Sequence, residues 1–164
     1  METNYTVPAN TRIGHIHLKV ADINRALEFY RDLLGFELTT MYGQQAAFLS
    51  AGGYHHHIGL NTWHSSGLPP SPINSVGLYH TAIVYPTRKD LAAIYDRIIK
   101  ANYPLTGASD HGVSEALYLD DPDGNGVELY WDRAKEFWPF KSDGSLEMVV
   151  KPLELDDLLR ELHL

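Results

Sequence analysis

The chain has 164 residues, of which 44% are hydrophobic, and its formal net charge is −8. This length and composition fit one packed domain, or two small modules that share a core. The acidic balance excludes a surface that tracks phosphates, so we expect no nucleic-acid partner, and the absence of cysteine excludes disulfides and zinc–sulfur sites. No signal peptide and no stretch long enough to span a bilayer is evident, so we expect a cytoplasmic protein without a membrane partner.

The first half of the chain has the pattern of a strand, a helix and three strands. Residues 14–22 alternate apolar and polar side chains, which predicts a strand. The segment 22–35 starts at the helix-capping residue Asp22, carries apolar residues at helical spacing and stops at Gly35, which predicts a helix. Three more strands are expected at residues 36–42, 45–51 and 55–63.

The second half repeats this order. Residues 79–87 read as a strand, and residues 87–103 read as a helix capped by Thr87. Two last strands are expected at residues 116–122 and 126–132, joined across a turn rich in Asp, Gly and Asn.

The spacing of residues within the two halves indicates an internal duplication. His15 precedes the first helix cap by seven residues, and His80 precedes the second cap by the same seven. An apolar residue stands eleven positions before Gly59, and another stands eleven positions before Glu128. In this alignment His15 is equivalent to His80, and Gly59 is equivalent to Glu128.

The fold class predicted by this duplication is α+β, with two tandem βαβββ modules that form a half-open barrel around a metal site, plus a C-terminal helical tail. The predicted segments are an N-terminal arm (1–11), the first module (12–63), a linker (64–77), the second module (78–132) and the tail (133–164). The linker, rich in Ser, Pro and Gly, permits the modules to pair within one chain or to swap in a dimer.

Glu128 is the residue that points to a metal. It interrupts an apolar strand, where a carboxylate is costly unless a cation compensates it. With His15 and His80 it would form a triad of two imidazoles and one carboxylate, which suits non-haem Fe(II). His17 is a rival ligand, since it shares a strand face with His15. Gly59, where a fourth ligand could stand, would leave room for a substrate.

Residues 111–128, with the sequence HGVSEALYLDDPDGNGVE, resemble the signature of type I extradiol ring-cleaving dioxygenases. These enzymes belong to the vicinal oxygen chelate superfamily, which also includes glyoxalases and fosfomycin and bleomycin resistance proteins. The resemblance covers about residues 12–132, and the GGYHHHIGLNTW run (52–63) is similar to small catechol 2,3-dioxygenase-like members. The positions that fill the signature are His111, Leu117, Tyr118, Asp121, Pro122, Gly124 and Glu128.

The resemblance implies an Fe(II)-dependent oxidoreductase for the degradation of aromatic compounds. It would cleave a catechol beside its two hydroxyl-bearing carbons with dioxygen. The implied iron ligands are His15, His80 and Glu128. The implied partners are a small aromatic substrate and dioxygen, and we expect a homo-oligomer.

The resemblance also implies three catalytic residues. Tyr118 would donate a hydrogen bond to a catecholate oxygen, and His111 would contact the substrate nearby. His56 would be the acid–base group, because histidine titrates near neutrality. Strict strand alternation would instead point His55 and His57 inward, so a local bulge is needed to favour His56.

Other superfamily functions remain as alternatives. One is a non-redox enzyme that uses Mn(II) or Zn(II), either glyoxalase-like or a thiol transferase that modifies an antibiotic. The other is a metal-free drug-binding resistance protein. Fold alone does not separate these functions.

Overall fold

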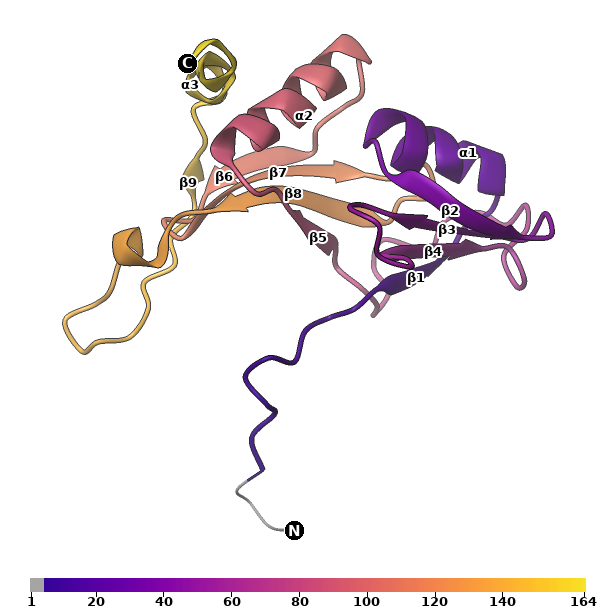
Figure 1. Ribbon diagram of the computed structural model, residues 1–164, viewed down its shortest axis with the longest axis horizontal. Coiled ribbons are helices and arrows are strands. Elements are labelled where there is room, and N and C mark those ends of the chain that lie inside the picture. The colour runs from indigo at the N-terminus through magenta and orange to yellow at the C-terminus, as the bar shows by residue number, and fades with distance from the viewer. Residues whose placement is uncertain (1–4) are drawn as a thin grey trace.

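The computed structural model describes residues 5–164, which form two β-sheets with α1 and α2 on the same side of them (Figure 1). Residues 1–4 of the predicted N-terminal arm lie outside the described residues. The predicted α+β class with two tandem βαβββ modules is confirmed. The two sheets stay separate and do not close into a barrel.

The first module has the predicted element order. Its elements are β1 (Ile16–Lys19), α1 (Ile23–Leu27), the π-helical segment η1 (Glu28–Leu33), β2 (Glu37–Tyr42), β3 (Ala46–Ser50) and β4 (Ile58–Asn61). In space the strand order is β1-β4-β3-β2, with β1 parallel to β4 and the other neighbours antiparallel.

The predicted first helix is present, but its second part widens into the π-helical segment. Asp22 caps its start by accepting a hydrogen bond from a backbone N–H of the first turn. The backbone N–H of Leu34 then donates to the carbonyl of Phe29, five residues back, at 2.9 Å. The chain leaves the helix at Gly35, whose φ of +86° suits a residue without a Cβ. The wide turn coincides with the burial of two adjacent aromatic side chains, Phe29 and Tyr30.

The second module has the predicted βαβββ order, and the tail adds one short strand. Its elements are β5 (Thr81–Val84), α2 (Arg88–Lys100), β6 (Gly107–Asp110), β7 (Ser114–Asp120) and β8 (Gly126–Asp132). The tail follows with η2 (Lys135–Phe137), β9 (Lys151–Pro152), α3 (Leu155–Arg160) and η3 (Glu161–His163). The sheet order is β5-β8-β7-β6-β9. The βαβββ order implies strand β6, but its own sequence, GASD, does not indicate its position, because it has no β-branched or aromatic residue.

The strand pairing confirms the register of the duplication. His17 lies beside Gly59 in the first sheet, and Ala82 lies beside Glu128 in the second, so His15 and His80 occupy equivalent positions. One detail differs from the spacing argument: the cross-strand neighbour of Gly59 is Phe48, and that of Glu128 is Tyr118. The position equivalent to Phe48 is therefore Tyr118 rather than Leu117, because the first hairpin is one residue longer.

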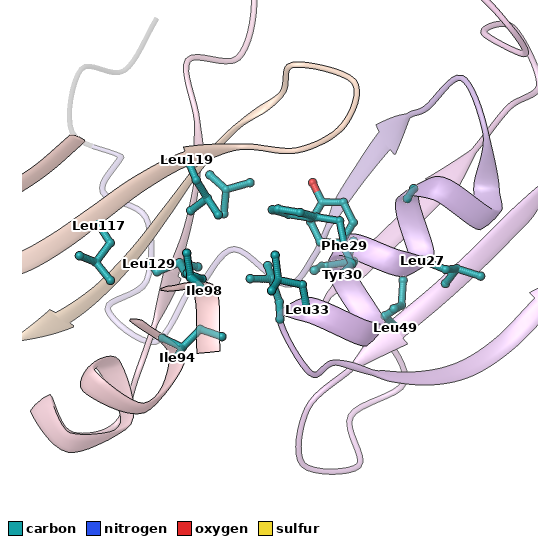
Figure 2. Packing of buried hydrophobic residues seen from close by; sticks show 14 of the residues in the cluster. Leu27, Phe29, Tyr30, Leu33, Leu49, Ile94, Ile98, Leu117, Leu119 and Leu129 are labelled. Carbon is teal, nitrogen blue, oxygen red and sulfur yellow. The ribbon is translucent and has the colours of Figure 1, made fainter. Parts of the chain in front are cut away.

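The two modules share one hydrophobic core on the helix side of the sheets. Figure 2 shows Phe29, Tyr30 and Leu33 of the first module facing Leu119 and Ile98 of the second. All five side chains are buried. Burial of this many large apolar groups fixes how the modules sit against each other.

A polar clamp joins the modules beside this core. The Tyr30 hydroxyl donates to Asp121 Oδ2 at 2.9 Å, and Arg25 forms an ion pair with Asp123. Burial and the neighbouring Asp121 carboxylate raise the pKa of Tyr30, so its hydroxyl keeps its proton as a donor. We call these four residues the inter-module clamp.

None of the helices in residues 5–164 is both long and apolar enough to cross a membrane.

Gly126 is required where β8 begins. A Cβ at this position would lie 2.4 Å from the carbonyl oxygen of Tyr79. We expect Gly126→Ala to lower the free energy of unfolding by about 2 kcal/mol, because backbone must move to relieve the overlap. Gly77→Ala is the matched control, since a Cβ there meets no atom within 4 Å, and its effect should stay within about 0.5 kcal/mol. Urea unfolding of both variants measures the difference, and equal stabilities would contradict the expectation.

Candidate metal and catechol site

Glu128 and His80 form the centre of the candidate site. Glu128 lies in β8, and His80 immediately precedes the neighbouring parallel strand β5. His80 Nε2 and Glu128 Oε2 are 3.0 Å apart, and the Glu128 side chain is only 13% exposed. Two groups of the kinds that bind Fe(II), an imidazole nitrogen and a carboxylate oxygen, therefore converge on one point.

Tyr118 and His111 extend this pair into a chain of hydrogen bonds. The Tyr118 hydroxyl oxygen lies 2.9 Å from Glu128 Oε1, to which it can donate, and 2.7 Å from His111 Nε2, which donates or accepts according to the tautomer of the ring. Burial and the bond to Glu128 raise the pKa of Tyr118, so the hydroxyl is protonated at neutral pH. The structure brings these four predicted residues together.

A cavity of about 510 Å³ opens beside this series of hydrogen-bonded side chains. Its wall includes Tyr79, His80 and Tyr118, together with Gly107 and Ser109 of β6. A volume of this size falls in the range of small-molecule sites.

His15 and His56 lie together in the first module. Their ring centroids are 4.4 Å apart, and the His56 ring also makes an edge contact with Phe48 at 5.1 Å. Desolvation, followed by the neighbouring imidazoles of His15 and His55, lowers the pKa of His56. His56 is therefore favoured in its neutral form, which can accept a proton.

The three consecutive histidines have different partners. Residues 55–57 precede β4, so the alternation of strand side chains does not apply to them. The His57 ring lies 3.2 Å from Ser50 Oγ, whereas the His56 ring packs against His15. His55 contacts His56 through their Nδ1 atoms at 2.8 Å.

The space beside Gly59 is filled by the His17 ring. A Cβ at position 59 would lie 2.9 Å from His17 Cγ. The expectation that Gly59 leaves room for a substrate is therefore wrong for this structure, because an imidazole already occupies the place. His17 also lies close to Phe48 and Trp63, and burial lowers its pKa.

The proposed triad is divided between the two sheets. His80 and Glu128 pair in the second sheet, while His15 packs against His56 in the first. Among residues 5–164, no three His, Asp or Glu side chains are arranged to hold a metal ion. One chain thus supplies two converging ligands, and the assignment of all three stays a prediction.

One partner of the site could not be found from the sequence. His111 Nδ1 lies 3.0 Å from the backbone carbonyl oxygen of Val149, 38 positions along the chain. A backbone carbonyl belongs to every residue, so no residue type signals such a contact.

Comparisons with known proteins cover most of the chain. The family model of the glyoxalase/bleomycin resistance protein/dioxygenase superfamily matches residues 12–129. A catechol-2,3-dioxygenase of Bacillus subtilis is 45% identical over 105 residues, covering 63% of this chain and 37% of that relative. A biphenyl-2,3-diol 1,2-dioxygenase of Rhodococcus globerulus is 36% identical over 126 residues, covering 74% of this chain and 63% of that relative. The chain therefore spans less than two thirds of the length of either dioxygenase.

The fold matches solved structures over most of its length. The crystal structure of a lactoylglutathione lyase from Agrobacterium tumefaciens has a TM-score of 0.60 and 21% identity. The match covers 81% of this chain and 100% of that chain. At this identity the similarity concerns the fold.

Proposed function

Because the chain belongs to the glyoxalase/bleomycin resistance protein/dioxygenase superfamily, we propose that it is an Fe(II)-dependent extradiol dioxygenase that opens the ring of a catechol with dioxygen. The observation that carries the proposal is the series of side-chain contacts from His80 through Glu128 and Tyr118 to His111. The similarity to two ring-cleaving dioxygenases supports it. A glyoxalase-like or thiol-transfer reaction has no evident use for the Tyr118–His111 pair.

The residues that would hold the iron are His80, Glu128 and His15. The donor set fits, since His80 Nε2 and Glu128 Oε2 already lie 3.0 Å apart and no Lys or Arg of residues 5–164 forms an ion pair with Glu128. When bound, Fe(II) would supply a common site for the two oxygens of a catechol and for dioxygen.

The other side chains would handle protons and orientation. Tyr118, held protonated, would contact a substrate oxygen next to Glu128. His111 would support the Tyr118 hydroxyl from behind, at 2.7 Å. Neutral His56, beside the ligand His15, would accept a proton from a catechol hydroxyl and later return it as the ring opens.

A second copy of the chain would complete this site. The shared core and the inter-module clamp hold the modules of one chain in place, and within residues 5–164 His15 does not join His80 and Glu128 in a group that could hold a metal. Exposed apolar residues flank both halves: Ile13, near His15, is 88% exposed, and Tyr79, next to His80, is 90% exposed. Such residues are suited to burial against another subunit. We propose that His15 and His56 of one copy meet His80 and Glu128 of the other.

Ring cleavage is tested by loading anaerobically purified protein with Fe(II) and adding catechols and dioxygen. We expect one dioxygen consumed for each yellow ring-opened product, with no uptake by the Zn(II)-loaded control. Absence of uptake across a panel of catechols, together with tight binding of Mn(II) or Zn(II), would favour a non-redox reaction of the superfamily instead.

Sharing of the site is tested by co-expressing two inactive variants, His15→Ala and Glu128→Ala. In a hybrid dimer one site has both defects and the other is intact. Random pairing should therefore restore about a quarter of the wild-type activity.

The control is co-expression of His80→Ala with Glu128→Ala. His80 and Glu128 of each site come from the same copy, so every site of the hybrid lacks one of the two residues. No activity should therefore return. A monomer in sedimentation, or failure of the first pair to recover activity, would refute the shared site.

A further inference from the structure

The two ring nitrogens of His111 have different neighbours. Nε2 faces the Tyr118 hydroxyl at 2.7 Å, and Nδ1 faces the carbonyl oxygen of Val149 at 3.0 Å. A carbonyl oxygen can only accept a hydrogen bond, so Nδ1 must carry the hydrogen. In a neutral ring, Nε2 then carries no hydrogen, and its lone pair is directed at the Tyr118 hydroxyl.

Val149 is held in this place by a second bond to the same residue. Its backbone N–H donates to the carbonyl oxygen of His111 at 3.1 Å. Two residues further, Lys151 of β9 pairs with Asp110 of β6, directly before His111. The carbonyl of Val149 is thus fixed by strand-like pairing rather than by a single flexible contact.

The rest of the tail is fitted closely around His111. Gly112, with φ of +77°, lies so near the tail that a Cβ there would be 3.0 Å from Pro139 Cγ and 3.3 Å from Val149 Cγ2. At its start, the tail is tied to the sheet by Arg133, which forms two bonds to Asp110 at 2.7 and 3.1 Å. Both ends of the segment 133–152 are therefore anchored next to His111. We call this segment the tail clasp.

The direction of the hydrogen bond matters because Tyr118 has a single hydroxyl hydrogen. In the Nδ1–H form, His111 Nε2 and Glu128 Oε1 are both acceptors within 2.9 Å of its oxygen and compete for that one hydrogen. A His111 ring with hydrogen on Nε2 would instead donate to Tyr118 and direct the hydroxyl hydrogen away from His111. Which of the two arrangements exists depends on the group that faces Nδ1.

The geometry points to the backbone carbonyl of Val149, on the tail clasp, as a positioning group that keeps His111 in the Nδ1–H form and its Nε2 lone pair on Tyr118. The tail clasp lies beyond residues 12–129, the part of the chain that matches the superfamily. It contacts His111 from outside that matched part of the chain. Its effect on rate rests on the proposed ring cleavage, but its effect on the His111 ring does not.

The first test is the tautomer of His111 in metal-free protein, read from the ring ¹⁵N shifts at about pH 8, where an ordinary histidine is neutral. The signal is assigned with His111→Gln. We expect the Nδ1–H form in the wild type and in Val149→Ala, which keeps the backbone. A wild-type ring in the Nε2–H form would overturn the proposal, whether or not any catechol is cleaved.

The second test uses Val149→Pro, which removes the N–H that bonds to His111 and displaces the carbonyl. We expect a mixture of tautomers and a kcat for catechol lowered by about 10- to 100-fold, with KM nearly unchanged. Val150→Ala, in the same segment but with an exposed side chain, should keep the wild-type kcat. A shifted tautomer with unchanged kcat, or an unchanged tautomer in the folded variant, would overturn the proposed role.

If Val149→Pro does not fold, Gly112→Val replaces it. The added side chain overlaps Pro139 and Val149 and should open the clasp from the other side. The same ¹⁵N shifts and the same separation of kcat from KM then decide the outcome.

Discussion

Replacing Glu128 with alanine should remove iron binding and ring cleavage together. Glu128 and His80 form the candidate ligand pair beside Tyr118, with Glu128 Oε2 and His80 Nε2 3.0 Å apart. The Glu128 side chain is nearly buried. Without it, His80 would be the one proposed ligand left in the second module. Loss of even an outer partner of a metal ligand lowers affinity by 10- to 100-fold, so loss of the ligand should cost more than about 100-fold. Iron content after desalting and dioxygen uptake measure the two effects.

Asp132→Asn is the matched control for Glu128→Ala. Asp132 is a carboxylate on the same strand and the same face, four residues beyond Glu128. Its variant should keep the iron and most of the activity. If Glu128→Ala retained full iron while Asp132→Asn lost it, the ligand assignment would be wrong.

Replacing Asp121 with alanine should give the largest loss of stability. Its carboxylate, 4% exposed as a residue, accepts from the Tyr30 hydroxyl, from the backbone N–H groups of Asp123 and Asn125, and from the Asn125 side chain, each at 2.9 Å. The substitution would leave a buried hydroxyl, two backbone N–H groups and one side-chain amide without their acceptor. We expect the free energy of unfolding to fall by about 3 kcal/mol.

The neighbouring residue supplies the control for this change. Asp120 is an exposed carboxylate in the same hairpin, and Asp120→Ala should change stability by no more than about 0.5 kcal/mol. Tyr30→Phe removes one member of the clamp and should cost about 1.5 kcal/mol. Urea titrations compare the three variants. An Asp121→Ala protein as stable as Asp120→Ala would show that the core alone holds the modules together.

Much of the fold was predictable because its signals are local. Helix caps at Asp22 and Thr87 and the period of apolar residues are written in short segments of sequence. The duplication predicts that His15 is equivalent to His80 and that Gly59 is equivalent to Glu128 in the two modules. The strand register confirms both equivalences.

What the sequence could not predict depends on contacts between distant segments. The contact of His111 with Val149 uses a backbone carbonyl. The filling of the space at Gly59 by His17 depends on the rotamer that one side chain adopts against its neighbours. The arrangement of the two sheets follows from packing of Tyr30 against the second module, which no single segment encodes.

The equivalence of Gly59 and Glu128 also constrains how this molecule can evolve. A duplicated module with identical halves would carry a carboxylate at both positions and two like sites. Here a Cβ at position 59 would lie 2.9 Å from His17 Cγ, so a carboxylate at that position and the present His17 side chain exclude each other. We expect substitutions at 17 and 59 to be non-additive, because a side chain at 59 fits only once a smaller residue stands at 17. A change at only one of the two positions gives a poorly packed protein, which maintains the asymmetry between the halves.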